Sequence, residues 1–361
     1  MKVLALGATG AIGRQMVAEL AAAGHEIHVT TRRMRKPGGS VRYLQGNARD
    51  PAFLVALLKE RWDAIIDFMV YETVEFSERV DTLLAATDQY VFISSARVFD
   101  DDHTSVRETS PRLLENSTDT EFLKSDEYAL TKARQENLLR ASATTNWTIV
   151  RPYITFGEGR LQLGNLEKED WLLRGVQGRS IVFCRDLLAK KTTMTDGTDV
   201  AAMIAAVIGR TEALGEDFNV VGPETMTWDE VLSVYLRGLE EHCGARPKVI
   251  LQDLETYCSW VSSVPQVRYD RMFNRCFDTS KLEKIFDVRS RTGSLKSLSA
   301  RLQSQLQSGS FLPLHARGEA LRDKAASEAS PLSNFSGRKD ALRYVVHRFV
   351  PQGALQKIRR N

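Results

Sequence analysis

Two side chains that can move protons stand four residues apart in the segment Tyr128-Ala129-Leu130-Thr131-Lys132. On a helix this spacing places the phenol and the ammonium on the same face. A free tyrosine has a pKa of about 10, too high for a base at neutral pH, but a neighbouring lysine cation favours the tyrosinate. The pair therefore predicts acid/base chemistry. The alternative is an exposed helix on which the two residues meet by chance.

Two serines follow an apolar run upstream of this pair. Val91-Phe92-Ile93 is typical of a buried parallel strand, and Ser94 and Ser95 come directly after it. Ligands of open α/β sheets bind at the carboxyl ends of the strands. A serine hydroxyl here is therefore placed to bind the substrate oxygen whose proton Tyr128 moves. The alternative is that both serines satisfy backbone groups at the end of the strand.

A glycine-rich loop lies near the N-terminus, with the sequence Gly7-Ala8-Thr9-Gly10-Ala11-Ile12-Gly13. Gly7 permits a tight turn, Gly10 lets a pyrophosphate approach the backbone, and Gly13 lets a helix pack closely on a strand. Free N–H groups at the start of a helix favour phosphate. The loop predicts a dinucleotide site, although glycine clusters also form plain turns.

The elements that position these residues alternate between strands and helices. We expect strands at 2–6, 26–30, 64–68, 89–94 and 147–150. We expect helices at 12–23, from Pro51 with Asp50 as its N-cap, at 74–86, and around 128–140 with Ser125 as its N-cap. Alternation of this kind implies βαβ units and a parallel sheet. The expected fold class is α/β: a Rossmann-type doubly wound parallel sheet with a smaller C-terminal mixed α/β substrate-binding domain.

The expected domain boundaries follow from the sequence after Arg151-Pro152, where the regular alternation of strand and helix patterns ends. We expect residues 1–155 to form the dinucleotide-binding domain, with returning segments near 181–222. Residues 156–180 and 223–305 are expected to form the substrate-binding cap. Residues 306–361 are expected to be a polar linker and a basic C-terminal tail.

The tail combines apolar and basic residues. Its apolar cluster consists of Tyr344, Val345, Val346, Phe349 and Val350, and its basic residues are Arg338, Lys339, Arg343, Arg348, Lys357, Arg359 and Arg360. Such a segment either lies on an anionic membrane surface or packs on protein. We favour a helix packed on the protein itself or on a subunit partner, and a homodimer is left open.

Composition narrows the class of protein. The 361 residues carry a net charge of +3, which argues against a nucleic-acid binder with a broad basic face. The four cysteines form no C-x-x-C pair, so no metal site is expected and the thiols are expected to be reduced in a cytoplasmic protein. No apolar stretch is long enough for a transmembrane helix, so no integral membrane protein is expected.

Taken together, these motifs resemble the short-chain dehydrogenase/reductase superfamily. More narrowly, the chain resembles its extended branch, the NAD-dependent epimerase/dehydratase family, many of whose members modify sugar nucleotides. The resemblance covers about residues 1–300. It rests on Gly7, Gly10 and Gly13, the strand-end serines, Tyr128 and Lys132, Arg151-Pro152, and Asp199-Val200-Ala201.

The resemblance implies a role for each matched residue. Ser95 is implied as the catalytic hydroxyl, Tyr128 as the acid/base, and Lys132 as its partner and a ligand of the cofactor ribose. The full set of expected cofactor contacts is Gly7, Thr9, Gly10, Ala11, Ile12, Gly13, Thr31, Arg32, Arg33, Asn47, Phe68, Met69, Lys132 and Tyr153.

Departures from the family pattern bear on the cofactor. Members that use NAD usually have an acidic residue at the end of the second strand, whereas this chain has Thr31 followed by Arg32 and Arg33. Two guanidiniums without a carboxylate favour a ribose phosphate, so NADP(H) is favoured and NAD(H) is possible. The alternative is a solvated pair of arginines. Asn47 replaces the adenine-contacting Asp, and Phe68 and Met69 are bulkier than the family's small residues.

Other departures bear on the reaction. Ala96 and Arg97 stand where a 4,6-dehydratase needs an Asp-Glu pair, so dehydration is not expected. The expected reaction is hydride transfer at a secondary alcohol or ketone of a nucleotide-activated sugar, at carbon 4, with a ketoreductase favoured over a 4-epimerase. The expected substrate-binding residues are Ala96, Arg97, Arg160 and Arg179, with Lys168 and Arg174 as further diphosphate partners.

A second class of protein stays open at this point. Some proteins that resemble this branch bind RNA or sense the cofactor without catalysis. They typically lack the Tyr or the Lys, or add a basic surface, whereas this chain retains Ser95, Tyr128 and Lys132 and has a small net charge. We therefore favour an enzyme that binds a nucleotide sugar and no nucleic acid.

Overall fold

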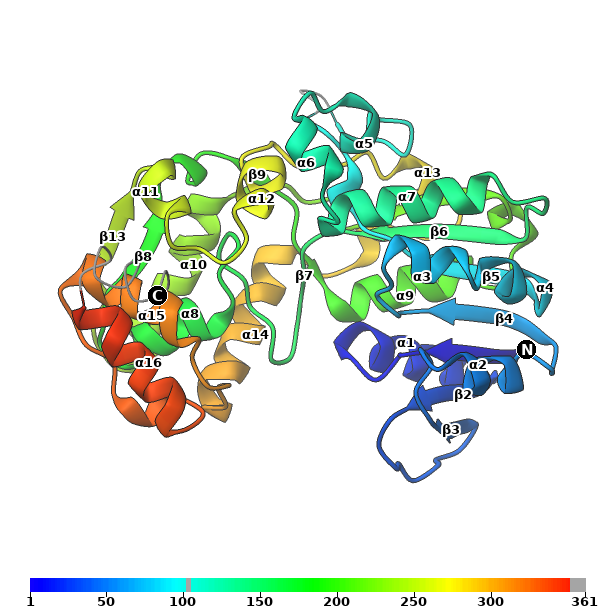
Figure 1. Ribbon diagram of the computed structural model, residues 1–361, viewed down its shortest axis with the longest axis horizontal. Coiled ribbons are helices and arrows are strands. Elements are labelled where there is room, and N and C mark those ends of the chain that lie inside the picture. Colours follow the sequence, from blue (N-terminus) through cyan, green and yellow to red (C-terminus); the bar gives the residue numbers. More distant parts are fainter. Residues whose placement is uncertain (102–104, 351–361) are drawn as a thin grey trace, which may run out of the picture. The chain divides into compact units, whose positions relative to one another are not determined.

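A computed structural model describes residues 1–101 and 105–350, and the chain divides into two compact units (Figure 1). The first unit comprises Met1–Gly157, Thr193–Thr225 and Phe273–Ser294. The second comprises Glu158–Thr192, Met226–Met272 and the chain from Leu295 onward. Each unit is described by itself below.

The first unit is built on a seven-stranded sheet in which all neighbouring strands are parallel. In spatial order its strands are β11 (Glu216–Val220), β6 (Trp147–Pro152), β5 (Thr87–Ile93), β4 (Trp62–Asp67), β1 (Lys2–Leu6), β2 (Glu26–Thr31) and β3 (Val41–Gln45). The strand order reverses between β1 and β4, the point at which open α/β sheets bind ligands. The doubly wound parallel sheet expected from the sequence is confirmed.

Helices cover both faces of this sheet (Figure 1). The helices α1 (Ala11–Ala22) and α9 (Gly197–Val207) pack on one face. The other is covered by α2 (Pro51–Leu57), α3 (Thr73–Ser77), α4 (Val80–Ala85) and α7 (Tyr128–Arg140). The central strand β1 is apolar from Val3 to Leu6 because both of its faces are buried, whereas the edge strand β3 is partly exposed.

Shorter elements complete the first unit. They are the 3-10 turns η1 (Ala96–Val98), η3 (Thr211–Ala213) and η5 (Val288–Ser290), the helices α5 (Leu113–Asn116), α6 (Thr120–Lys124) and α13 (Ser280–Glu283), and the parallel strand pair β7 (Thr155–Phe156) and β10 (Thr195–Asp196).

Local sequence explains where several helices begin. Asp50 caps α2 as expected, because its carboxylate accepts from the N–H groups of Ala52 (2.8 Å) and Phe53 (3.1 Å). Two expectations were wrong. The helix expected at 74–86 is interrupted between α3 and α4. Ser125 ends α6, and Glu127 instead caps α7 by accepting from the N–H of Ala129 at 2.6 Å.

The second unit contains mostly helices with two small sheets. Its helices are α8 (Lys168–Val176), α10 (Trp228–Cys243), α11 (Leu254–Cys258), α12 (Val264–Gln266), α14 (Ser294–Ser308), α15 (Ala316–Ala326) and α16 (Arg338–Phe349), with the short turns η2 (Arg185–Leu187), η4 (Val267–Arg271) and η6 (Leu332–Asn334). Strand β8 (Ile181–Cys184) pairs in parallel with β13 (Val249–Gln252), and β9 (Lys191–Thr192) pairs antiparallel with β12 (Met226–Thr227).

The structure corrects the expected domain boundaries in three places. Residues 181–192 belong to the second unit, because β8 pairs with β13 and not with the large sheet. Residues 273–294 belong to the first unit instead of the cap. The segment expected to be a polar linker from 306 onward contains α15 and α16, which pack on each other around the buried ring of Tyr344.

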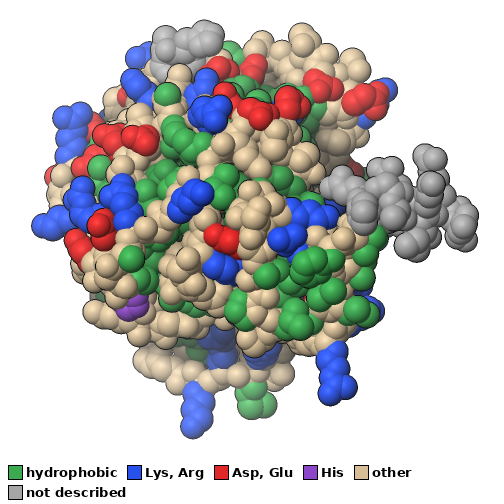
Figure 2. All heavy atoms as spheres, turned by 90° about the vertical axis from the view of Figure 1, so that its left-hand side faces the viewer, with side chains coloured by type: hydrophobic (Ala, Val, Ile, Leu, Met, Phe, Trp, Pro, Cys, Tyr) green, Lys and Arg blue, Asp and Glu red, His purple; other side chains and the backbone are tan. Residues whose placement is uncertain are grey.

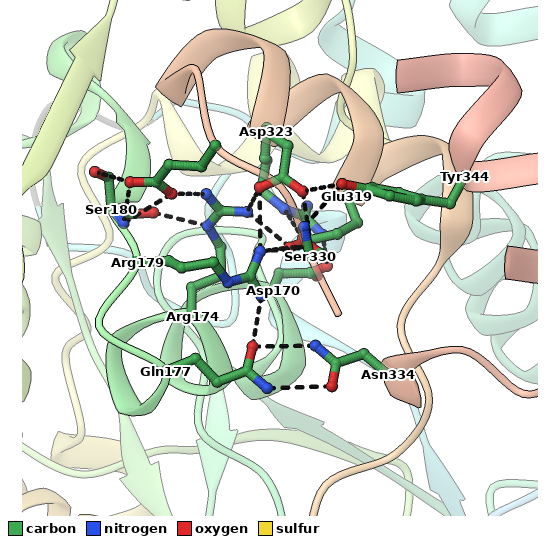
Figure 3. Close-up of polar contacts among 12 residues, drawn as sticks. Asp170, Arg174, Gln177, Arg179, Ser180, Glu319, Asp323, Ser330, Asn334 and Tyr344 are labelled. Atoms are coloured by element: carbon green, nitrogen blue, oxygen red, sulfur yellow. Dashed lines mark hydrogen bonds and ion pairs between the residues drawn. The ribbon is translucent and has the colours of Figure 1, made fainter. Parts of the chain in front are cut away.

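A buried network of charges fixes α15 to α8 (Figure 3). The guanidinium of Arg174 on α8 binds the carboxylates of Glu319 and Asp323, each at 2.7 Å. Arg179 binds the same two carboxylates, and the hydroxyl of Tyr344 donates to Asp323 at 2.6 Å. Burial by itself raises the pKa of Glu319, but the guanidiniums of Arg322, Arg174 and Arg179 lower it to about 2.

The tail expected to be basic and amphipathic is described as far as Val350. Helix α16 exposes Leu342 and Phe349, and Figure 2 shows apolar side chains interspersed with lysines and arginines on this face of the second unit. Lys357, Arg359 and Arg360 lie outside the described residues. Along residues 1–101 and 105–350, no helix combines the length and apolar character that a membrane crossing requires. Contact of the tail with a partner or a membrane stays a prediction.

The charge network predicts a large effect of removing one guanidinium. Arg174→Leu leaves two buried carboxylates short of a counter-charge, so the free energy of unfolding should fall by about 3–5 kcal/mol. Arg343→Leu is the matched control, because Arg343 is exposed on α16 and pairs there with Asp340 at 3.0 Å, outside the buried network. It should cost at most about 1 kcal/mol, the upper end of what an exposed ion pair contributes. Urea unfolding followed by tryptophan fluorescence measures both, and equal losses would contradict the prediction.

Candidate active site

The glycine loop forms a cradle at the carboxyl end of β1. Gly7 has a φ of +71°, a backbone conformation that favours glycine, and its N–H donates to Thr30 Oγ1 at 3.0 Å. A Cβ atom on Gly13 would lie 2.6 Å from Ala8 Cα, so only glycine lets α1 pack so closely on the loop. A Cβ on Gly10 would meet no heavy atom within 4 Å among the described residues. This open position beside the start of α1 fits a dinucleotide pyrophosphate.

Other expected cofactor contacts lie at the same edge of the sheet. Thr9 and Ile12 flank the cradle, and Ala11 begins α1. Met69 lies over the loop, since a Cβ on Gly7 would come within 2.7 Å of Met69 Sδ, and Phe68 precedes it directly after β4. Because the carboxyl ends of parallel strands share one edge, the structure brings these residues together.

Two arginines that form no ion pair with the described residues follow β2. Thr31 Oγ1 donates to the carbonyl of Arg33 at 2.9 Å and accepts from its N–H at 3.3 Å, which fixes the turn. Arg32 and Arg33 are exposed, and among residues 1–101 and 105–350 no carboxylate pairs with either side chain. Both are therefore available to an anionic ligand.

Asn47 and Tyr153 lie at the ends of other strands. Asn47 is exposed just beyond β3, and its side-chain oxygen accepts from the N–H of Arg49 at 3.2 Å. Tyr153 is buried just beyond β6, with its ring centre 5.4 Å from that of Phe277. Their expected contacts with the cofactor stay predictions.

Hydrogen bonds distinguish the two serines after β5. The hydroxyl of Ser94 donates to Glu136 Oε1 at 2.6 Å, so its hydrogen is already used. Ser95 Oγ accepts from the N–H of Arg97 at 3.2 Å, which leaves its hydroxyl hydrogen available to a ligand. This geometry favours Ser95 as the serine that binds substrate.

Contacts on both sides of Ser95 attach it to α7. Lys132 is buried, and its Nζ donates to the carbonyl of Ile93 at 2.8 Å. Arg97 pairs with Glu127 at the start of α7 and lies over the ring of Tyr128, 5.3 Å from the ring centre. These contacts tie Tyr128 and Lys132 to the segment that carries Ser95.

The charge of Lys132 is sensitive to its surroundings. Burial lowers the pKa of Lys132, whereas the carboxylates of Asp67 and Glu136 raise it, and the result is about 8. The ammonium also lies 4.4 Å from the ring centre of Phe92. Lys132 is therefore a cation at neutral pH that loses its proton in the mildly alkaline range.

A buried ion pair that sequence reasoning missed holds α7 on β6. Arg151 Nε and Nη2 donate to the two carboxylate oxygens of Glu136, each at 2.7 Å, and both side chains are fully buried. Burial raises the pKa of Glu136, but the charge and hydrogen bonds of Arg151, with Ser94 and Arg112, lower it to about 2. One sequence signal was available: Glu136 follows Lys132 by four residues, on the same helix face.

The structure leaves one expected substrate residue without a partner in the described part of the chain and buries or pairs the others. Arg160 is exposed and has no partner within the described part of the chain, so it stays a candidate. Ala96 is fully buried in η1, and Arg97 is paired with Glu127.

Arg174 and Arg179 require a correction, because their guanidiniums are buried against Glu319 and Asp323 inside the second unit (Figure 3). Lys168 binds Glu169 and the carbonyl of Ser310.

Comparison with known proteins places this site in a family. Residues 3–221 match the NAD dependent epimerase/dehydratase family, which is more than half of the chain. The chain belongs to this family. No curated protein matches it.

Solved structures share the fold of this family member at low sequence identity. A UDP-glucuronic acid 4-epimerase from Bacillus cereus, in complex with UDP-glucuronic acid and NAD, has a TM-score of 0.63 and 16% identity over 86% of this chain and 100% of its own. MoeE5 in complex with UDP-glucuronic acid and NAD has a TM-score of 0.64 and 18% identity over 85% of this chain and 100% of its own. A short-chain dehydrogenase/reductase superfamily protein from Agrobacterium tumefaciens with bound NAD has a TM-score of 0.62 and 16% identity over 86% of this chain and 98% of its own.

The geometry of the cradle predicts that substituting Gly13 lowers stability, whereas substituting Gly10 lowers dinucleotide affinity. Gly13→Ala forces α1 away from Ala8, so the free energy of unfolding should fall by about 1–3 kcal/mol. Gly10→Ala meets no protein atom within 4 Å in the described residues, so stability should stay within about 0.5 kcal/mol while dinucleotide affinity falls. Thermal unfolding and a fluorescence titration with NADPH and NADH measure the two effects. Unchanged affinity in Gly10→Ala would contradict the proposed position of the pyrophosphate.

Proposed function

We propose that this protein transfers a hydride between a nicotinamide dinucleotide and carbon 4 of a nucleotide-activated sugar, at a secondary alcohol or ketone. The observation that carries the proposal is the available hydroxyl hydrogen of Ser95, tied on both sides to the helix of Tyr128 and Lys132. Family membership and the nucleotide sugars in the named structures support the same substrate class.

The residues of the chain divide the proton chemistry between them. Ser95 donates a hydrogen bond to the substrate oxygen at the reacting carbon. Tyr128 gives its phenolic proton to that oxygen when a ketone is reduced, and takes the proton from it when an alcohol is oxidised. Lys132 favours the tyrosinate through its positive charge. The dinucleotide, when bound on the glycine loop, supplies or accepts the hydride.

We propose NADP(H) as the cofactor and reduction of a keto-sugar as the net reaction. The free guanidiniums of Arg32 and Arg33 suit a ribose 2′-phosphate, and Thr31 brings no carboxylate to repel it. A net reduction consumes one dinucleotide per turnover, which requires an exchangeable cofactor. Ala96 and Arg97 offer no acid–base pair for elimination, so we propose no dehydration step.

A second candidate is a 4-epimerase that uses the same serine, tyrosine and lysine. The compared structures favour it, because one is named a 4-epimerase and all three hold NAD. An epimerase oxidises the alcohol, lets the ketone turn and reduces its other face, so it regenerates its cofactor. Denaturing the purified protein and identifying the released dinucleotide distinguishes the two: retained NAD⁺ supports the epimerase, whereas a site that is empty and binds NADPH supports the reductase.

The acid/base role of Tyr128 predicts a selective loss. Tyr128→Phe should lower kcat by at least about 100-fold, because a general acid/base contributes about 10²–10⁴-fold. Cofactor affinity should change less than about twofold, since only the phenol oxygen is removed. Tyr43→Phe on β3 is the matched control and should keep full turnover. Substantial activity in Tyr128→Phe with a panel of UDP- and dTDP-linked sugars and keto-sugars would overturn the mechanism.

The arginines after β2 predict a difference between two cofactors. Replacing Arg32 and Arg33 with Ala should weaken NADPH binding at least about tenfold, because hydrogen bonds to charged groups contribute about 1.5–3 kcal/mol each. NADH binding should change much less, since it lacks the 2′-phosphate. Arg42→Ala, which removes an exposed guanidinium on β3, is the control. Equal losses for the two dinucleotides in calorimetric titrations would refute the NADP(H) proposal.

A further inference from the structure

We propose that Asp67 is a positioning residue of this site: a buried anion that keeps Lys132 in its ammonium form and holds the loop after β4 over Gly7. The proposal rests on the proposed function, in which Lys132 acts through Tyr128. Nothing in the pattern of catalytic residues requires an acid at this position, the last residue of β4.

Both carboxylate oxygens of Asp67 are held in place, and the side chain is fully buried. One oxygen accepts from the N–H of Met69 at 2.8 Å, which fixes the turn that places Met69 over the glycine loop. The other accepts from the hydroxyl of Tyr90 on β5, also at 2.8 Å. Asp67 therefore connects the cofactor cradle with the strand that leads to Ser95.

Strand register places Asp67 next to Phe92, the ring over which the Lys132 ammonium lies. Asp67 lies opposite Phe92 in the parallel ladder of β4 and β5, and neighbouring strands are about 4.8 Å apart. The Lys132 ammonium lies over the Phe92 ring, 4.4 Å from its centre. Asp67, Tyr90 and Phe92 point to the sheet face that α7 covers, so carboxylate and ammonium share one buried layer.

Asp67 is the carboxylate of this layer that binds no arginine among the described residues. Glu136, the other carboxylate that acts on Lys132, already binds Arg151 through both oxygens and also pairs with Arg112. Within residues 1–101 and 105–350, Asp67 forms no ion pair at contact distance. Its charge is therefore the one left to balance the Lys132 ammonium.

The titratable groups around this pair come from several elements. Tyr71 follows β4, Tyr90 lies on β5, Lys132 lies on α7, and Arg79 before α4 lies over the ring of Tyr71. Burial raises the pKa of Asp67 to about 6, against the hydrogen bonds from Met69 and Tyr90 and the charge of Lys132. The pKa of Lys132 is about 8. Both groups are charged above about pH 6 and below about pH 8, and one of the two charges is lost outside this window.

Asp67→Asn tests the proposal by the pH dependence of kcat/KM. The variant keeps an oxygen that accepts from Met69 but removes the charge. Lys132 then loses its proton more readily, so the alkaline limb of the profile should move at least about one pH unit lower, the low end of the effect of a neighbouring charge. An unmoved alkaline limb overturns the proposal, whether the rate is unchanged or falls equally at every pH.

Tyr90→Phe is the matched control, because it removes a hydrogen bond from Asp67 but keeps the charge. The alkaline limb should stay in place. The acid limb near pH 6 should move to higher pH, since the carboxylate loses a donor that stabilises its ionised form. If Asp67→Asn does not fold, this acid limb decides: a shift supports the proposal, and an unchanged limb overturns it.

The experiments distinguish a failure of the proposed function from a failure of the role proposed for Asp67. Turnover by the unmodified protein and its loss in Tyr128→Phe test the proposed function and do not involve Asp67. If that loss is observed and the limbs of the Asp67 and Tyr90 variants do not move, the function stands and the role of Asp67 is refuted. If Tyr128→Phe stays active, the mechanism on which Asp67 acts is itself refuted.

Discussion

The buried pair of Glu136 and Arg151 is the constraint on which the rest of the site depends. Two charges inside the first unit are tolerable only because each is fully hydrogen-bonded by the other and by neighbouring groups. The pair sets how α7 lies on β6, and therefore where Tyr128 and Lys132 are placed. It also accepts the hydroxyl hydrogen of Ser94, whereas the hydroxyl hydrogen of Ser95 stays available. A charge pair with no role in the proposed proton transfer thus distinguishes Ser95, the serine of the proposed mechanism, from Ser94.

Much of the first unit follows from the sequence because its signals are local. The apolar strands, the glycine loop, the cap at Asp50 and the i, i+4 spacing of Tyr128 and Lys132 each act over a few residues. The sheet edge then follows from the shared direction of parallel strands. The position of Ser95 relative to Tyr128 was expected from a family pattern, and the structure adds the contacts of Ile93 and Arg97 that produce it.

The second unit was harder to predict because its stabilising contacts link segments far apart in the sequence. Arg174 and Arg179 have the charge expected of diphosphate ligands, but their partners Glu319 and Asp323 lie about 140 residues further along the chain. No local pattern reveals such a partner. The polar composition after residue 305 suggested a linker for the same reason: its acidic residues look solvent-exposed until the arginines they neutralise are known.

The charge network also has a consequence for how the chain can be shortened. The family match ends at residue 221, and trimming a protein to its recognised family segment is a common way to prepare it for crystallisation. Here a cut before α15 would leave two buried arginines, Arg174 and Arg179, without the carboxylates of Glu319 and Asp323. The last helices are thus part of the folding unit. A proteolytic cut between α14 and α15 would destabilise the buried charge network that α15 forms with α8.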